Sequence, residues 1–307
     1  MAVVQQVLIM FILIAVGFVC YKTKLFSEEG TQTIASVVIY IANPATLFMA
    51  FLTRAGGQDY RERLAGLGHS FLLSVIALVV SLVVTFILIR DRGANERKAA
   101  VEQISLFLTN CGFIGIPLVW GVFGDEGVFY LAAFIAVNNV AVWTLGVVKM
   151  KGERIKPAYL LNACKSPAII GIVLGLIAFL TQLQLPAIPQ TAIGYAAGLT
   201  TPLAMLTAGA TIAKVDLKAM LGKYRLLYLG FLRLLLIPLL TYAAFLFVPA
   251  GDIVKGTNLL AAACPSAAMC VVLAVRYGGD STYAAEIFAA TTLLSMLTLP
   301  LAMMLPW

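Results

Sequence analysis

The chain has 307 residues, of which 62% are hydrophobic and 11% are charged, and its mean hydropathy is +0.99. About a quarter of the residues in a soluble globular protein are charged, so this composition excludes an ordinary soluble domain and indicates an integral membrane protein. The net charge is +7, but the 21 Lys and Arg residues are spread along the chain and form no basic domain, so no nucleic-acid partner is expected.

A membrane helix needs about 20 mainly apolar residues to cross the hydrocarbon of a bilayer. Segments of this kind recur along the whole chain and leave little sequence for a soluble domain. We predict ten membrane helices, at residues 3–21, 31–52, 69–89, 101–122, 128–148, 158–181, 190–212, 224–247, 256–275 and 283–305.

The positions of the basic residues predict the orientation of these helices. Most Lys and Arg residues fall in or beside the connections that follow the first, third, fifth, seventh and ninth predicted helices. Cytoplasmic loops carry the positive excess, so we expect a multi-pass protein of the inner (cytoplasmic) membrane with both termini outside. The first apolar run is too long for a signal peptide and lacks a positively charged start, so it is expected to act as the first membrane anchor.

The two halves of the chain share features at corresponding places. A shift of 154 positions aligns residues 123–130 with residues 277–284, and Asn110 with Cys264. Because each half has five predicted helices, an odd number, the second half would enter the membrane from the opposite side. We therefore predict an all-α membrane protein with a first five-helix repeat at residues 1–149, a cytoplasmic linker at 150–157 and an inverted second repeat at 158–307.

The fourth and ninth predicted helices contain residues near their centres that break a helix or carry a polar side chain. Irregular backbone at membrane depth is tolerated where it lines a cavity, and breaks at matching places in two repeats indicate a binding site near the bilayer midplane. Each second half-helix would begin with free N–H groups that attract an anion. The predicted substrate-binding residues are Asn110, Cys111, Gly112, Gly115, Pro117, Cys264, Pro265 and Ser266.

Three asparagines carry amide groups that can both donate and accept a hydrogen bond. Asn110 lies at the break in the fourth helix, so we predict that it contacts the substrate. Asn138 and Asn139 on the fifth helix are further candidates, but membrane asparagines also join helices to one another. Both roles remain open for Asn138, and the joining role is expected for Asn139.

Three charged residues within the predicted helices have candidate roles in anion binding or ion coupling. Arg233 lies deep in the eighth helix, and it either helps to hold the anion, extends to the cytoplasmic edge, or pairs with Glu286. Glu102 and Glu286 lie near the cytoplasmic starts of the fourth and tenth helices. Each could exchange a proton if it is buried, or it could be an interfacial carboxylate in water.

Two pairs of glycines have the small-xxx-small spacing that lets membrane helices approach closely. They are Gly171 with Gly175 and Gly194 with Gly198. We expect both pairs to tighten packing within the protein rather than to mark a dimer seam.

Four stretches of the sequence resemble the auxin efflux carrier family of membrane transporters, in its short bacterial form that is often described as malonate-transporter-like. They are residues 24–30 with the following Asn43-Pro44, residues 109–127, residues 201–209 and residues 264–300. The long plant members carry a large loop at the midpoint. This chain has only a short linker there, which favours a bacterial-type transporter over an auxin carrier.

The resemblance implies a fold similar to that of bile acid/sodium symporters and sodium/proton antiporters, with two inverted repeats and two crossed, broken helices. Helices 1, 2, 6 and 7 would form a scaffold, often dimeric, and helices 3–5 and 8–10 would form a transport domain that moves in an elevator-type cycle. We expect a homodimeric secondary transporter that carries small organic anions such as carboxylates by efflux or exchange.

Several other functions remain as alternatives or are excluded. A cation/proton antiporter or a sodium-coupled symporter of the same fold would need acids at the crossing, and residues 263–267 and the pair Asn138-Asn139 contain none. A membrane sensor or channel is the alternative of another class. The cysteines lack metal-ligand spacing and the sequence has no His-Glu-x-x-His motif, so we expect neither an enzyme nor a bound metal or cofactor.

Overall fold

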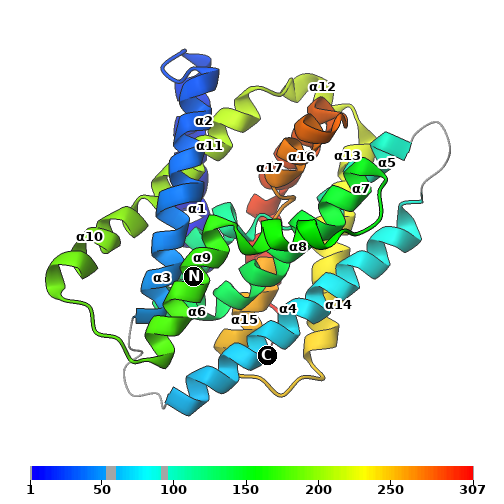
Figure 1. Ribbon diagram of the computed structural model, residues 1–307. Helices are drawn as coiled ribbons and strands as arrows, with labels where there is room; N and C mark the ends of the chain where they lie inside the picture. Colours follow the sequence, from blue (N-terminus) through cyan, green and yellow to red (C-terminus); the bar gives the residue numbers. More distant parts are fainter. Residues whose placement is uncertain (1, 53–59, 91–95, 307) are drawn as a thin grey trace.

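The computed structural model describes residues 2–52, 60–90 and 96–306. Within these ranges the chain is helical and contains no strand, which confirms the prediction of an all-α protein (Figure 1). The elements of the first half are α1 (Ala2–Lys22), α2 (Glu28–Val37), η1 (Val38–Ala42), α3 (Asn43–Leu52), α4 (Tyr60–Leu88), α5 (Glu96–Phe107), η3 (Cys111–Gly115), α6 (Ile116–Ala141), η4 (Val142–Gly146) and α7 (Val147–Lys151). The elements of the second half are α8 (Pro157–Cys164), α9 (Pro167–Leu180), α10 (Ala187–Gly198), α11 (Thr200–Ala213), α12 (Leu217–Leu221), α13 (Tyr224–Phe231), η5 (Leu232–Leu236), α14 (Ile237–Phe245), α15 (Asp252–Ala263), α16 (Met269–Tyr277) and α17 (Ser281–Ala302).

Many of these helices are long and apolar enough to cross a membrane. The described residues contain seven such segments, or eight if α8 and α9 form one bent span. The helices α5, α15 and α16 do not qualify because they have only 12, 12 and 9 residues. These short helices lie beside the predicted breaks, and none of them is long enough to cross a membrane by itself. The number of long continuous helices is therefore below the ten predicted membrane helices. A multi-pass membrane protein is supported, and the number of crossings stays a prediction.

Several helices begin earlier than predicted, and the difference is largest for α4 and α5. α4 begins at Tyr60 rather than at residue 69, and α5 begins at Glu96 rather than at residue 101. The first turns of both helices contain polar and charged residues that lower the local hydropathy. Such residues do not prevent helix formation, because acidic side chains are favourable at a helix N-terminus.

The predicted sixth span is bent rather than straight. α8 and α9 meet at an angle of 63°. The Ser166 side chain accepts a hydrogen bond from the Ile169 N–H, and Pro167 occupies the first turn of α9. A serine N-cap followed by proline starts a new helix, so the bend is encoded locally.

A wider, π-helical turn precedes three prolines in otherwise continuous helical segments. η1 precedes Pro44, η3 precedes Pro117 and η5 precedes Pro238. Proline has no N–H to donate and its ring clashes with the carbonyl four residues earlier, so the backbone relaxes into a wider turn. Each of these prolines therefore has a local change of helix geometry just before it.

Glycine allows close packing between two pairs of helices. α1 packs along α11, and a Cβ added at Gly17 or at Gly209 would lie only 2.2 or 2.0 Å from a backbone oxygen of the other helix. α3 packs along α9, where a Cβ at Gly171 would lie 2.7 Å from the Pro44 oxygen. At Gly194 and Gly198 an added Cβ would meet no atom within 4 Å. The expectation of tight packing within this chain is therefore met at Gly171 and is wrong for Gly194 and Gly198.

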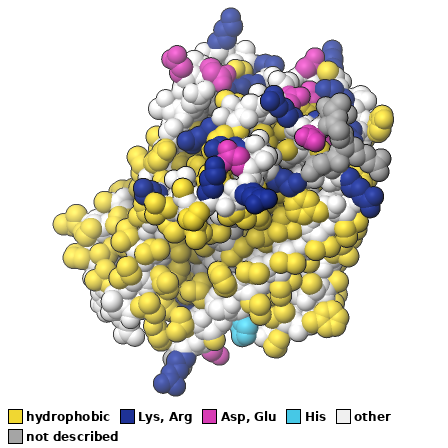
Figure 2. Space-filling view, turned by 45° about the vertical axis from the view of Figure 1, so that its right-hand side comes forward, with side chains coloured by type: hydrophobic (Ala, Val, Ile, Leu, Met, Phe, Trp, Pro, Cys, Tyr) yellow, Lys and Arg dark blue, Asp and Glu magenta, His cyan; other side chains and the backbone are white. Residues whose placement is uncertain are grey.

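The surface has the distribution of side chains that a membrane protein needs. Figure 2 shows hydrophobic side chains over the lower part of one face, with most of the visible Lys and Arg side chains above them. Large apolar residues such as Phe71, Val79 and Ile177 are more than half exposed. An apolar surface of this extent is expected to contact lipid.

Candidate functional site

The two predicted breaks meet at one crossing in the interior of the protein. α5 ends at Phe107 and η3 begins at Cys111, while α15 ends at Ala263 and α16 begins at Met269. The irregular segments between them form an antiparallel β-bridge that pairs Thr109 with Ser266. The crossing therefore joins segments that run in opposite directions.

Backbone hydrogen bonds hold this crossing together. The Asn110 N–H donates to the Pro265 oxygen at 2.9 Å, and the Ala267 N–H donates to the Leu108 oxygen at 3.2 Å. Buried backbone groups need partners, and in a membrane interior water cannot supply them. Each broken segment thus satisfies the other, which explains how irregular backbone persists at this depth.

The second halves of both broken segments begin at partly exposed residues. Gly112 and Phe113 lie at the start of η3, and Ala268 and Met269 lie at the start of α16, next to residues that are buried. The first N–H groups of a helix have no partner within it, and the helix dipole places partial positive charge there. Each of these two helix starts is therefore electropositive and partly accessible, although the Cys111 N–H already donates to the Thr109 Oγ1 at 3.2 Å.

Two buried asparagine side chains have polar atoms without a hydrogen-bond partner at this position. They are the Asn110 Nδ2, a donor, and the Asn43 Oδ1, an acceptor; Asn110 is 4% exposed and Asn43 is 6% exposed. Asn43 also donates from its Nδ2 to the Gly112 oxygen at 3.2 Å. The sequence indicated Asn110 by its place at the break. The sequence indicated Asn43 only as the neighbour of Pro44. Its contact with Gly112 could not be predicted, because the two residues are far apart along the chain.

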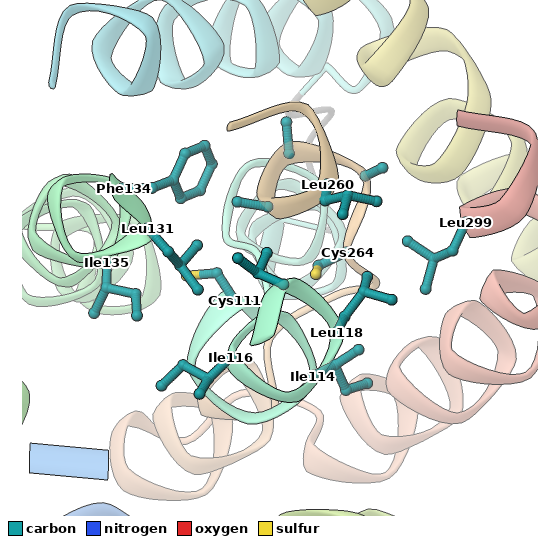
Figure 3. Packing of buried hydrophobic residues seen from close by; sticks show 14 of the residues in the cluster. Cys111, Ile114, Ile116, Leu118, Leu131, Phe134, Ile135, Leu260, Cys264 and Leu299 are labelled. Carbon is teal, nitrogen blue, oxygen red and sulfur yellow. The ribbon is translucent and has the colours of Figure 1, made fainter. Parts of the chain in front are cut away.

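Several predicted site residues lie in the apolar core instead of at the accessible edge. Figure 3 shows the Cys111 and Cys264 side chains among buried apolar residues such as Leu260. Gly115 lies against both cysteines, since an added Cβ would lie 3.2 Å from the Cys111 Cβ and 3.4 Å from the Cys264 sulfur. Pro117 is buried, and its oxygen accepts a hydrogen bond from Gln6. These residues shape the crossing through packing and backbone contacts.

The residues of the second break also face the interior. The Pro265 oxygen bonds to Asn110 across the crossing. The Ser266 N–H donates to the Thr291 Oγ1 at 3.2 Å, and the Ser266 hydroxyl contacts the Cys270 sulfur at 3.8 Å. Ser266 is fully buried, so its hydroxyl points into the protein.

Asn138 and Asn139 have different environments. Asn138 accepts a hydrogen bond from the Thr109 N–H at 3.1 Å and donates to the Thr109 oxygen at 3.2 Å. Its amide therefore provides a hydrogen-bond partner for both the N–H and the carbonyl group of Thr109, a residue of the broken segment. Asn139 donates to the Ile135 oxygen in its own helix at 3.0 Å.

Arg233 is almost completely buried, with 1% of its surface exposed, and lies behind the crossing. It donates to three backbone oxygens, those of Leu106 at 3.0 Å, Ala262 at 3.0 Å and Cys264 at 2.8 Å. The two expectations that Arg233 extends to the cytoplasmic edge or pairs with Glu286 are therefore wrong. Its guanidinium instead donates to carbonyl groups at the ends of two helices.

Glu102 and Glu286 are buried, and each pairs with a basic side chain that is nearly half exposed. Arg225 donates to both oxygens of Glu102, with a distance of 3.0 Å from its Nε, and the Tyr283 hydroxyl donates to Glu102 at 2.8 Å. Lys223 contacts both oxygens of Glu286 at 2.7 Å. Glu102 is 4% exposed and Glu286 is 9% exposed, so the alternative of an interfacial carboxylate in water is wrong for both.

A small cavity borders the crossing, between α4, α6 and η5. Its lining includes Ser74, Thr109, Asn138 and Arg233, and its volume is about 10 Å³. This space corresponds to about one water molecule, so it is too small for an organic anion. Among the described residues, no group of three or more His, Cys, Asp or Glu side chains is placed to hold a metal ion.

Comparison with known proteins gives a consistent result along the whole chain. A family model described as "Membrane transport protein" matches residues 2–160 and 153–303. An uncharacterized transporter of Methanothermobacter thermautotrophicus is 26% identical over 305 residues, which cover 97% of this chain and 96% of the relative. An uncharacterized transporter of Methanocaldococcus jannaschii is 26% identical over 301 residues, which cover 96% of each chain.

Proposed function

The chain belongs to the membrane transport protein family, as its resemblance to the auxin efflux carriers indicated, and we propose that it is a secondary transporter of small organic anions. It is a transporter and not an enzyme. The substrates are carboxylates, carried by efflux or exchange across the inner (cytoplasmic) membrane. The observation that carries this proposal is the meeting of two helix N-terminal ends beside the unpartnered Nδ2 of Asn110.

The chemistry of the crossing favours an anion over a cation. Helix N-termini and an amide N–H group are donors, and donors suit carboxylate oxygens. A cation/proton antiporter would need a carboxylate at the crossing, but Glu102 and Glu286 are engaged with Arg225 and Lys223. The helix N-termini and the Asn110 Nδ2 at the crossing are positively polarised, which disfavours the antiporter.

The proposed topology has ten crossings in two inverted five-helix repeats. The helical segment Cys111–Lys151 has 41 residues, and at 1.5 Å per residue it would extend about twice the thickness of the hydrocarbon core. Gly124 interrupts it with non-helical angles (φ 63°, ψ −154°), so we divide it there into two spans. The two segments broken at residues 108–110 and 264–268 then count as one span each. The gathering of basic residues above the apolar surface in Figure 2 supports a cytoplasmic side there, and we propose that both termini lie on the other side.

We propose that the transporter works by an elevator-type cycle. α1, α3, α9 and α11 pack together in pairs and would form the core of a scaffold, which would also carry the seam of a homodimer. The helices α4 to α7 and α13 to α17 would move as the transport domain. Asn43 of the scaffold contacts Gly112 of the transport domain, so the proposed site lies where the two groups of helices meet.

Transport by purified protein tests this function. Proteoliposomes that contain the wild-type chain should take up radiolabelled acetate, malonate or succinate, and Asn110→Ala should lower uptake by about tenfold or more, because it removes a buried donor to a charged group. Asn162→Ala is the matched control, since Asn162 is exposed on α8 and distant from the crossing in the sequence. Normal uptake by a folded Asn110→Ala protein would remove Asn110 from the site, and no uptake of any carboxylate by the wild type would contradict the proposed function.

A further inference from the structure

Arg233 differs from the buried acidic residues of the described chain in what it contacts. Glu102 and Glu286 each face a basic side chain. The three hydrogen bonds of Arg233 all go to backbone oxygens, and its Nε has no hydrogen-bond partner. A fully buried guanidinium without a carboxylate partner is costly unless other negative groups surround it.

The three backbone oxygens belong to the ends of the first half-helices. Leu106 is in the last turn of α5, and Ala262 and Cys264 lie at and just beyond the end of α15. The last carbonyls of a helix lack partners within it, and each helix end carries roughly half a negative charge. Two such ends together match about one positive charge, which explains why Arg233 is stable there.

In transporters built on broken helices, the two kinds of half-helix end have different binding roles. The N-terminal ends of half-helices bind anionic substrate groups, while their C-terminal ends and unwound carbonyls coordinate the coupling cation. In this chain a side chain already occupies the C-terminal ends of both broken segments. Arginine is permanently charged and donates through several N–H groups in a fixed geometry, so it can contact both helix ends at once.

We propose that Arg233 is a resident cation that takes the place of a coupling ion at the crossing. This inference rests on the proposed function in assuming that the cargo is an anion. It implies that the anion binds without sodium, since the charge that balances it travels with the protein. Arg233 is a positioning residue: it holds the two C-terminal ends together, so that the two N-terminal ends stay aligned for the anion.

The neutral variant Arg233→Gln tests this proposal through its response to cations. Uptake of acetate, malonate or succinate by the wild type should be the same in NaCl and in choline chloride at equal ionic strength. The variant leaves the carbonyl ends without a cation, so sodium should raise its uptake by about fivefold or more. Sodium should also raise its melting temperature in detergent, whereas the wild type should melt at the same temperature in both salts.

Two further variants complete the test. Lys218→Gln removes a positive charge from an exposed site on α12 and should show no response to sodium. Arg233→Lys keeps a cation at the carbonyl ends and should also be independent of sodium, at a lower melting temperature. This variant decides the question if Arg233→Gln does not fold.

The outcomes separate this inference from the proposed function. Sodium-dependent uptake or melting of the wild type would overturn the role of Arg233, as would a folded Arg233→Gln protein that is indifferent to sodium in both measurements. Sodium stimulation of Arg233→Lys would overturn it as well. If the wild type carries none of the three carboxylates, the proposed function fails by itself, and the melting temperatures still decide whether Arg233 stands in for a cation.

Discussion

Asn110 and Arg233 contact opposite ends of the same helix breaks. Asn110 precedes η3, where partial positive charge gathers, and its amide has an unused donor. Arg233 donates to the carbonyls that end the first half-helices. The negative helix ends are thereby covered by a side chain, and this asymmetry is the basis on which we propose that the crossing binds an anion.

At the residue scale, the ion pair of Glu102 should contribute to stability. Glu102→Gln leaves the guanidinium of Arg225 and the hydroxyl of Tyr283 facing a neutral amide in a buried place. We expect a loss of about 1 to 3 kcal/mol in the free energy of unfolding, reduced from the value for a fully buried pair because the Arg225 side chain is 43% exposed. A lower melting temperature of the purified variant in detergent would show this loss.

Glu153 in the linker provides a matched control with similar partners. It accepts hydrogen bonds from Lys156 and from Tyr159, which hold the pKa of its carboxyl below the ordinary value, but it lies at the surface. Solvent screens such a pair, so Glu153→Gln should leave the melting temperature unchanged. Equal losses in the two variants would mean that burial does not strengthen the Glu102 pair.

At the scale of elements, proline and glycine explain most of the departures from straight helices. The sequence was sufficient to predict the breaks near Asn110 and Pro265, because residues that weaken a helix cluster there in both halves. It was not sufficient for the 63° bend before Pro167, since apolar residues on both sides of the bend hide it from a hydropathy window. The serine N-cap at Ser166 is the local signal that could have revealed it.

The glycines of α9 and α10 give a prediction about helix packing. In Gly171→Ala the new methyl group would meet the Pro44 backbone at 2.7 Å, and backbone atoms cannot swing away. We expect a destabilisation of about 1 to 3 kcal/mol from overpacking, measured by thermal unfolding in detergent.

Gly194→Ala is the matched control, because an added Cβ there meets no atom of this chain within 4 Å. Its effect on unfolding should be neutral or slightly stabilising, since alanine favours a helix over glycine. A Gly171→Ala protein as stable as the wild type would contradict the close packing of α9 on α3.

At the scale of the whole molecule, the contacts that define the site join residues far apart in the sequence. Asn43 meets Gly112, Asn110 meets Pro265 and Arg233 meets Leu106. Composition and the recurring apolar segments predicted the all-α membrane class, and the helix-weakening residues at matching places predicted the paired breaks. A single sequence carries no distances between segments, so it left the role of Asn138 open and wrongly offered Glu286 as a partner for Arg233.

The same long-range contacts provide hydrogen-bond partners for the irregular backbone of the buried crossing. The two broken segments satisfy each other through the bridge between Thr109 and Ser266. Asn138 forms hydrogen bonds with both backbone groups of Thr109, and Arg233 donates hydrogen bonds to the carbonyl groups at the helix ends. The Nδ2 donor of Asn110 and the Oδ1 acceptor of Asn43 remain without a hydrogen-bond partner, and we place the anion beside the Asn110 donor.

The most direct test of the central claim is the distance between a bound carboxylate and Asn110. Solid-state NMR dipolar recoupling can measure this distance in membranes that contain the wild-type chain with ¹⁵N-labelled asparagine side chains and malonate labelled with ¹³C at its carboxyl carbons. We predict a coupling that corresponds to about 3.5 to 4.5 Å, as expected for a carboxylate that accepts a hydrogen bond from the amide, and its loss in Asn110→Ala. Bound malonate without this coupling, or the same coupling in the variant, would contradict an anion site at the crossing.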